Sequence, residues 1–294
     1  MKVGIVLEVG VAPGTVWEWP RVRANALRAE AEGLDSVWVP DHFFYRPAEG
    51  DVIGMEDSWT VLSAVAGITE RIEIAPIVLA GAFRNPGLMA NMTRTLDAVS
   101  GGRLTLGIGA GWHDPEFEAY GYPTDHKVGR FEEWVQIVLP LLRGETVTFD
   151  GRWYQARDAA VYPPPSRRIP VLIAGNKPRM MRLVARHADS WNTAWFGHPD
   201  DRLHERLRDL EAALDAEGRD PATLERTVGL IVRDPDQPAE EEDDESPFSG
   251  SVEELAELLR EHEALGFAHA IVILQPGTER SIERLAEAAR LSRG

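Results

Sequence analysis

Short apolar segments alternate with amphipathic helical segments along most of this chain, and this alternation constrains its fold more than any other feature. The predicted strands are Val3–Leu7, Ser36–Val39, Ile72–Leu79, Arg103–Ile108, Ile169–Ile173, Ser190–Thr193, Thr227–Val232 and Ala268–Leu274. The predicted helices are Trp19–Ala31, Ser58–Gly67, Pro86–Val99, Gly129–Leu142, Pro178–Arg186, Asp201–Glu217, Val252–Leu265 and Thr278–Leu291. Such a succession of strand–helix units predicts an α/β fold, the (β/α)8 barrel, whose ligands bind where the strands end.

Two segments do not fit a minimal barrel. Residues 145–168 contain a strand pattern on either side of Asp150-Gly151 and then a run of prolines, which predicts an inserted hairpin near the pocket. Residues 234–249 are strongly acidic and poor in apolar side chains, which predicts a mobile loop. We expect a single domain over residues 1–294, because 44% hydrophobic residues suffice for one large core.

Composition restricts the classes of partner. The net charge of −17 disfavours nucleic acid and anionic membranes, so small molecules are the expected partners. The chain has no cysteine, which excludes disulfides and thiolate chemistry. It has no apolar run long enough to span a membrane, and Met1-Lys2 leads into the first strand without a signal-peptide pattern. We therefore expect a cytoplasmic protein.

A glycine-rich stretch follows the fourth predicted strand and ends at Trp112-His113. Glycines let the backbone approach a flat or phosphorylated ligand, although a flexible turn has the same composition. Trp112 stands where a dinucleotide fingerprint needs its third glycine, so a Rossmann site is disfavoured.

The second predicted strand ends in Asp41-His42, which brings a carboxylate and an imidazole to the barrel mouth. Imidazole exchanges protons near neutral pH, so general acid–base catalysis is one interpretation, and a packed histidine beside a capping aspartate is the other. The third strand is apolar up to its exit and forms either a wall beneath a ring or only a strand end. The eight histidines show no metal-ligand spacing, so we expect no metal site.

Aromatic residues gather near several predicted strand ends and predict an apolar pocket. They are Phe43, Phe44, Tyr45, Trp112, Trp191, Trp195 and Phe196.

Several motifs together resemble the luciferase-like flavin and deazaflavin oxidoreductases, over nearly the whole chain from Val3 to the final helix. These motifs are Gly33–Trp38, Asp41–Phe43, Arg84–Pro86, Leu96–Leu104, Gly107–Trp112 and Asp189–Asn192. The resemblance is greater to the branch that uses coenzyme F420, and it implies a homodimer.

The resemblance also implies roles for individual residues. His42 would act in proton transfer, and a cis peptide would join Ile77 to Val78 behind the cofactor ring. The loop Ala174–Lys177 would bind a phosphodiester at a helix start. The residues expected to bind the cofactor are Asp41, Ile77, Val78, Ala80, Ala110, Gly111, Trp112, Gly175, Asn176 and Lys177. Some family dehydrogenases carry a glutamate where this chain has Trp112, so the resemblance does not support sugar-phosphate oxidation.

Three functions follow from this resemblance. The first is an F420-dependent oxidoreductase that transfers a hydride between the deazaflavin and a carbonyl, an alcohol or an activated double bond. The second is an FMN-dependent monooxygenase that uses O2 and needs a separate cofactor reductase. The third is a flavin- or deazaflavin-binding protein without turnover.

Overall fold

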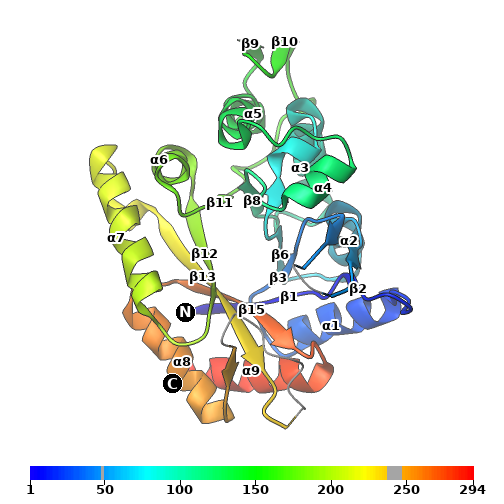
Figure 1. The fold of residues 1–294 in the computed structure, drawn as a ribbon, viewed down its shortest axis with the longest axis vertical. Coiled ribbons are helices and arrows are strands. Elements are labelled where there is room, and N and C mark those ends of the chain that lie inside the picture. The colour runs from blue at the N-terminus through cyan, green and yellow to red at the C-terminus, as the bar shows by residue number, and fades with distance from the viewer. Residues whose placement is uncertain (48–49, 237–246) are drawn as a thin grey trace.

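A computed structural model describes residues 1–47, 50–236 and 247–294 and has a barrel of parallel strands at its centre (Figure 1). Its strands are β1 (Lys2–Val6), β3 (Ser36–Val39), β6 (Glu73–Pro76), β7 (Leu79–Ala80), β8 (Leu106–Gly109), β11 (Val171–Ala174), β12 (Ser190–Phe196), β13 (Glu225–Arg233) and β15 (His269–Gln275). Hydrogen-bonded neighbours run β6, β3, β1, β15, β13, β12, β11, β8, β7. Barrel strands that pair with each other therefore also follow one another along the chain, except that the last barrel strand, β15, pairs with the first, β1.

The barrel closes between β6 and the segment before β8. The amide of Ile74 donates to the carbonyl of Arg103 at 3.1 Å, and the amide of Thr105 donates to the carbonyl of Ile74 at 3.0 Å. The predicted barrel is confirmed. Several strand ends shift by a few residues. The main difference is that the third predicted strand is divided into β6, which pairs with β3, and β7, which pairs with β8.

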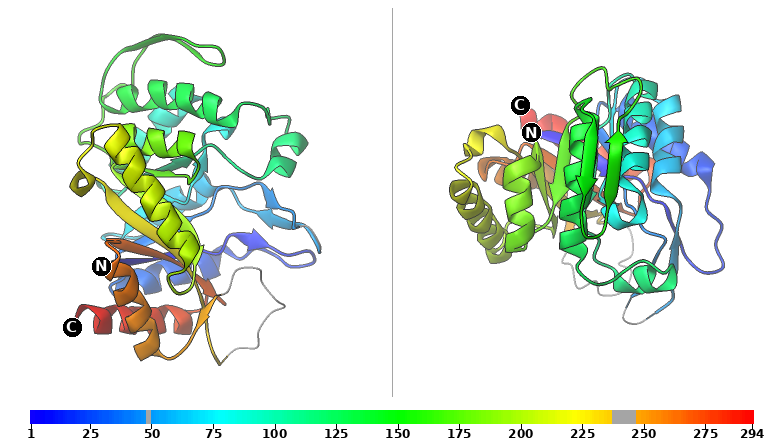
Figure 2. Two further views of the ribbon diagram at one scale, coloured as in Figure 1. Left: turned by 60° about the vertical axis from the view of Figure 1, so that its left-hand side comes forward. Right: turned by 90° about the horizontal axis from the view of Figure 1, so that it is seen from above.

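Helices cover the outside of the strands (Figures 1 and 2). They are α1 (Trp19–Ala31), α2 (Ser58–Ile68), α3 (Pro86–Val99), α4 (Asp114–Ala119), α5 (Lys127–Leu142), α6 (Pro178–His187), α7 (Asp201–Ala216), α8 (Val252–Ala264) and α9 (Glu279–Arg293). Local signals explain most of their starts. The side chain of Asn85 caps α3 ahead of Pro86, and Ser251 forms a capping box with Glu254 at α8.

The core has two parts. The larger apolar cluster fills the space between the strands and the helices. A smaller cluster contains Trp38, Ala75, Ile77, Leu172 and Ile271, with the partly exposed Val6, Val78 and Trp195 packed against it. Its members come from strands on opposite sides of the barrel, so this cluster fills the barrel interior beneath the mouth and leaves an apolar floor there.

The two unusual segments have different outcomes. The predicted hairpin is confirmed, since β9 (Val147–Asp150) pairs antiparallel with β10 (Gln155–Ala159). Most of the acidic loop, residues 237–246, lies outside the described residues. The flanking strand β14 (Phe248–Ser249) runs parallel to the end of β13.

The sequence patterns missed α4 and a small antiparallel sheet. This sheet consists of β2 (Gly10–Val11), β5 (Ile53–Met55) and β4 (Phe44–Tyr45). Strands of two or three residues are too short to leave a periodic pattern. Within the described ranges, no helix is long and apolar enough to cross a membrane.

Candidate active site

The exits of β3 and β8 bring His42 against Glu116, a residue of α4 that the sequence analysis did not select. Nδ1 of His42 lies 2.8 Å from Oε1 of Glu116. The backbone amide of Phe43 donates to Oε2 of the same carboxylate at 2.9 Å. The Glu116 side chain is only 2% exposed, so both of its oxygens are committed to the segment that carries His42.

This contact determines which nitrogen of His42 can exchange a proton. A carboxylate accepts hydrogen bonds, so Nδ1 carries a hydrogen toward Glu116. The second nitrogen, Nε2, is then the atom that can exchange a proton with a ligand. Glu116 can also stabilise the imidazolium that forms when His42 takes up a second proton.

Asp41, next to His42, lies in a buried ion pair. Its carboxylate accepts from both Nη atoms of Arg84, at 2.8 and 2.9 Å, and from the amide of Ala80 at 3.0 Å. Burial raises the pKa of the Asp41 carboxyl, and the guanidinium of Arg84 opposes this rise. Burial lowers the pKa of Arg84, but Asp41 and Asp57 outweigh it and hold that pKa above its usual value. Asp41 thus ties the exit of β3 to β7 through the Ala80 amide and to the segment before α3 through Arg84, while its role as a cofactor contact stays a prediction.

A second histidine, His113, is held neutral beside His42. The backbone amide of Arg46 donates to its Nε2 at 3.0 Å, so this nitrogen must be unprotonated. Burial lowers the pKa of His113, which agrees with that geometry. Its ring centroid lies 5.3 Å from that of Tyr45 and 6.3 Å from that of His42. His113 therefore adds an uncharged ring to the wall of the mouth.

Trp112 presents an exposed indole at the mouth. Its side chain is 65% exposed, and its ring meets that of His42 edge to face at a centroid distance of 5.6 Å. The ring centroid of Tyr45 lies 6.0 Å from that of the same indole. A large exposed aromatic beside a polar cluster is typical of a surface that a flat ligand covers.

Two of the aromatic residues assigned to the pocket lie elsewhere. Trp191 and Phe196 are buried in the core around the strands, and Trp191 donates from Nε1 to the carbonyl of Gly175 at 2.9 Å. They lie near strand ends in sequence, but both belong to the larger apolar cluster. Their role is packing.

The predicted cis peptide between Ile77 and Val78 is present, and a second cis bond before a residue other than proline joins Ala194 to Trp195. The glycines of β8 are needed for packing inside the barrel. A Cβ on Gly107 would lie 2.1 Å from the carbonyl oxygen of Pro76, and one on Gly109 would lie 2.9 Å from Val78. These glycines permit close packing between strands, while contact of this stretch with a ligand stays a prediction.

The loop Ala174–Lys177 joins β11 to α6. Gly175 has φ +153°, and a Cβ there would lie 2.7 Å from Met180, so the turn needs glycine. Lys177 is exposed and directly precedes the helix. The first-turn amides of a helix lack intrahelical partners, so this loop suits an anion, but its contact with a phosphodiester stays a prediction.

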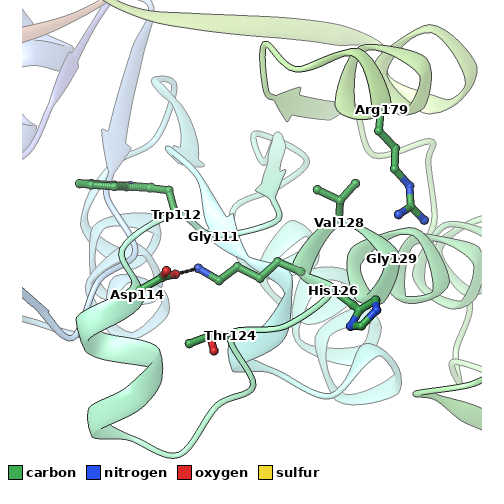
Figure 3. A pocket seen from close by; sticks show the side chains of 9 residues that line it. Gly111, Trp112, Asp114, Thr124, His126, Val128, Gly129 and Arg179 are labelled. Carbon is green, nitrogen blue, oxygen red and sulfur yellow. Dashed lines mark hydrogen bonds and ion pairs between the residues drawn. The ribbon is translucent and has the colours of Figure 1, made fainter.

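An open cavity of about 510 Å³ lies between the exit of β8 and the first turns of α5 and α6. Figure 3 shows Trp112 and Arg179 on opposite sides of it. Lys127, which also lines this cavity, pairs with Asp114 and lies over the ring of Phe117. Among the residues that the structure describes, no three potential ligand side chains gather as a metal site.

Comparison with known proteins places this site in a family. The family profile described as luciferase-like monooxygenase matches residues 1–281. The chain belongs to this family. The family resemblance read from the motifs is thereby confirmed.

Individual members of the luciferase-like family show what the chain is similar to. An F420-dependent glucose-6-phosphate dehydrogenase from Kineococcus radiotolerans is 32% identical over 220 residues, which are 73% of this chain and 64% of that protein. The chain spans less than two thirds of the length of the curated relatives that it matches first.

Two solved structures have the same fold. An F420-dependent secondary alcohol dehydrogenase in complex with an F420-acetone adduct has a TM-score of 0.83 at 20% identity, over 100% of this chain and 99% of that one. Monooxygenase RslO1 from Streptomyces bottropensis has a TM-score of 0.81 at 20% identity, over 100% of both chains.

Proposed function

We propose that this chain is a coenzyme F420-dependent oxidoreductase that transfers a hydride between the deazaflavin and a small organic substrate. The observation that carries the proposal is His42, which Glu116 orients at a barrel mouth beside an exposed indole. Relatives named as F420-dependent enzymes support the choice of cofactor.

The residues at the mouth fit such a cofactor. The apolar floor includes the partly exposed Val78 and Trp195, which suits a flat ring. The proposed holding residues are Asp41, Ile77, Val78, Ala80, Ala110, Gly111, Trp112, Gly175, Asn176 and Lys177. When bound, a deazaflavin supplies a carbon that gives or takes a hydride and that reacts poorly with O2.

The residues of this chain then donate or accept the proton that accompanies hydride transfer. In the reducing direction, His42 donates a proton from Nε2 to the substrate oxygen or carbon, and in the oxidising direction it accepts one. Glu116 fixes the ring and its tautomer. The pair of Asp41 and Arg84 holds the β3 exit in place, so that His42 needs no rearrangement before reaction.

The wall around His42 favours an uncharged substrate. Trp112, Tyr45 and the neutral His113 present rings there, and Glu116 is fully occupied by the protein. We therefore infer a carbonyl, alcohol or activated alkene with apolar substituents rather than a sugar phosphate.

Anaerobic turnover tests the proposal. Purified protein with reduced F420 should reduce hydrophobic ketones or enones. The reaction is measured as the return of the absorbance of the oxidised cofactor. Tight F420 binding without turnover of any carbonyl, alcohol or enone would favour the non-catalytic alternative.

The FMN-dependent monooxygenase is the second candidate, favoured by the description of the matching family profile. It predicts O2 consumption with reduced FMN from a separate reductase. An oxygen electrode distinguishes the two, because the F420 reaction proceeds without O2.

We also propose a cytoplasmic homodimer of single-domain chains. The family resemblance and the absence of cysteine from the sequence support this proposal. Light scattering after size-exclusion chromatography would give twice the chain mass of 32.6 kDa if the dimer forms.

A further inference from the structure

Arg206 reaches from α7 to the loops that follow β11 and β12. Its Nη1 donates to Oγ1 of Thr193 at 2.7 Å and to the carbonyl of Ala194 at 2.8 Å. Its Nε and Nη2 lie 3.3 and 2.9 Å from the side-chain oxygen of Asn176, in the amide orientation that satisfies both groups. One guanidinium therefore joins the end of β12 to the loop that we propose for the cofactor's anionic group.

Arg206 is half-buried and hydrogen-bonds only to neutral groups. All of its protein partners are neutral oxygens, and none of the described carboxylates pairs with it. Burial and the neighbouring Arg202 lower the pKa of Arg206, and the attraction of Asp200 and Glu205 offsets this only in part. A half-buried guanidinium whose hydrogen-bond partners are all neutral can attract an anionic ligand.

The contact with Arg206 also fixes the direction of the Asn176 amide. Because its oxygen accepts from the guanidinium, its NH2 group must point the other way, as a donor. On the adjacent residue, the carbonyl of Gly175 is occupied by Nε1 of Trp191. The side-chain oxygen of Asn176 and the carbonyl of Gly175 are thus both occupied by protein donors. The NH2 group of Asn176 is left to donate to a ligand.

We infer that Arg206 is a positioning residue for the anionic group of the cofactor: it holds Asn176 as a donor toward that group and supplies the positive potential of the site. The inference rests on the proposed function, because that function places a phosphodiester at this loop. Exposed Lys177 is a weaker source of potential, because water screens it.

A purely structural role makes a different prediction. Arg206 also lies over the ring of Phe196, with its guanidinium carbon 5.2 Å from the centroid, and it could serve only to brace the β12 exit. A brace would affect every ligand of the mouth equally. A positioning residue for an anion would affect only ligands that carry the anion.

The test compares two ligands that share one ring system. Fluorescence titration measures the affinity for F420 and for the deazaflavin riboside that lacks the phosphodiester. We expect Arg206→Gln to weaken F420 binding by about 10- to 100-fold, the range for a charge-assisted hydrogen bond, and to change riboside binding less than about twofold. Arg206→Lys should recover part of the loss. Equal weakening of both ligands, or no weakening of F420, would overturn the inference.

Arg202 offers a matched control on the same helix. Its guanidinium carbon lies 4.3 Å from the centroid of Phe196, and its Nη2 donates to the carbonyl of Trp195 at 2.7 Å. No contact joins Arg202 to Asn176 in the described residues. Arg202→Gln should therefore leave the preference for F420 over the riboside unchanged, and a loss of preference equal to that of Arg206→Gln would contradict us.

Asn176 provides a second test. Asn176→Asp would pair with Arg206 and present a negative charge to the ligand, so it should weaken F420 binding more than Asn176→Ala does. If it binds F420 as well as wild type, the inference is wrong.

Failure of the proposed function can be recognised separately. If the wild type binds FMN and not F420, the cofactor assignment fails. The same variants are then titrated with FMN and riboflavin, which also differ in phosphate, and selective loss of FMN would still support the role of Arg206.

Discussion

The two sides of the barrel mouth differ in whether their charged side chains have oppositely charged partners. On the His42 side, made of Asp41, His42, Arg84 and Glu116, every buried charge has a partner within hydrogen-bond distance. On the Arg206 side, made of Asn176, Lys177 and Arg206, the cations have no described carboxylate partner. The difference supports our proposal that one side moves a proton and the other holds an anion.

The largest expected effect tests the His42 side. His42→Ala should lower kcat by roughly 10²–10⁴-fold, the usual contribution of a general acid–base group, and leave the cofactor dissociation constant unchanged. Steady-state kinetics and fluorescence titration measure the two quantities. Wild-type kcat at every pH would remove His42 from proton transfer.

Next in size is the buried ion pair. Arg84→Ala leaves Asp41 buried without its partner, so the free energy of unfolding should fall by about 3–5 kcal/mol. Denaturant titration measures it. As a control, Arg21→Ala breaks an exposed pair with Glu8 and should change stability by less than about 1 kcal/mol. Equal effects of the two variants would mean that the Asp41–Arg84 pair does not hold the β3 exit.

The orienting role of Glu116 predicts a smaller loss. Glu116→Gln keeps the size of the side chain but removes the charge that fixes the His42 tautomer, so kcat should fall about 10- to 100-fold. The matched control is Glu118→Gln, an exposed position on the same helix, which should retain activity. Loss of cofactor affinity with kcat preserved would argue that Glu116 acts on binding instead.

Lys177 should give the smallest effect and sharpen the comparison within the Arg206 side. Lys177→Ala exposes no buried partner, so F420 binding should weaken by less than about 1 kcal/mol. Calorimetry measures the F420 dissociation constants of Lys177→Ala and Arg206→Gln and shows which variant loses more affinity. A greater loss of F420 affinity in Lys177→Ala than in Arg206→Gln would mean that Lys177 makes the main contact with the anion.

Local signals explain how much of the fold the sequence predicts. Helices α1 and α3 begin and end at the predicted residues, because a proline at the start and an apolar face of helical period identify them. The division of the third strand into β6 and β7 leaves no such trace, since Ile77 and Val78 read as an unbroken apolar strand.

The candidate site is less predictable. Asp41-His42 is visible because two ionisable residues end a strand, but Glu116 lies 74 positions further along the chain. Only the barrel, which places the exits of β3 and β8 at one mouth, brings it to His42. Arg206 is likewise one of several arginines on a polar helix, and its sequence context does not separate it from Arg202 or Arg208.

The central claim is that the mouth binds a deazaflavin whose ring meets His42 and whose anionic group meets the Arg206 side. Calorimetric titration of the wild type with F420 and with FMN, in one buffer, tests it most directly. The account predicts tighter binding of F420. Micromolar or better binding of FMN without measurable binding of F420 would contradict it and favour the monooxygenase.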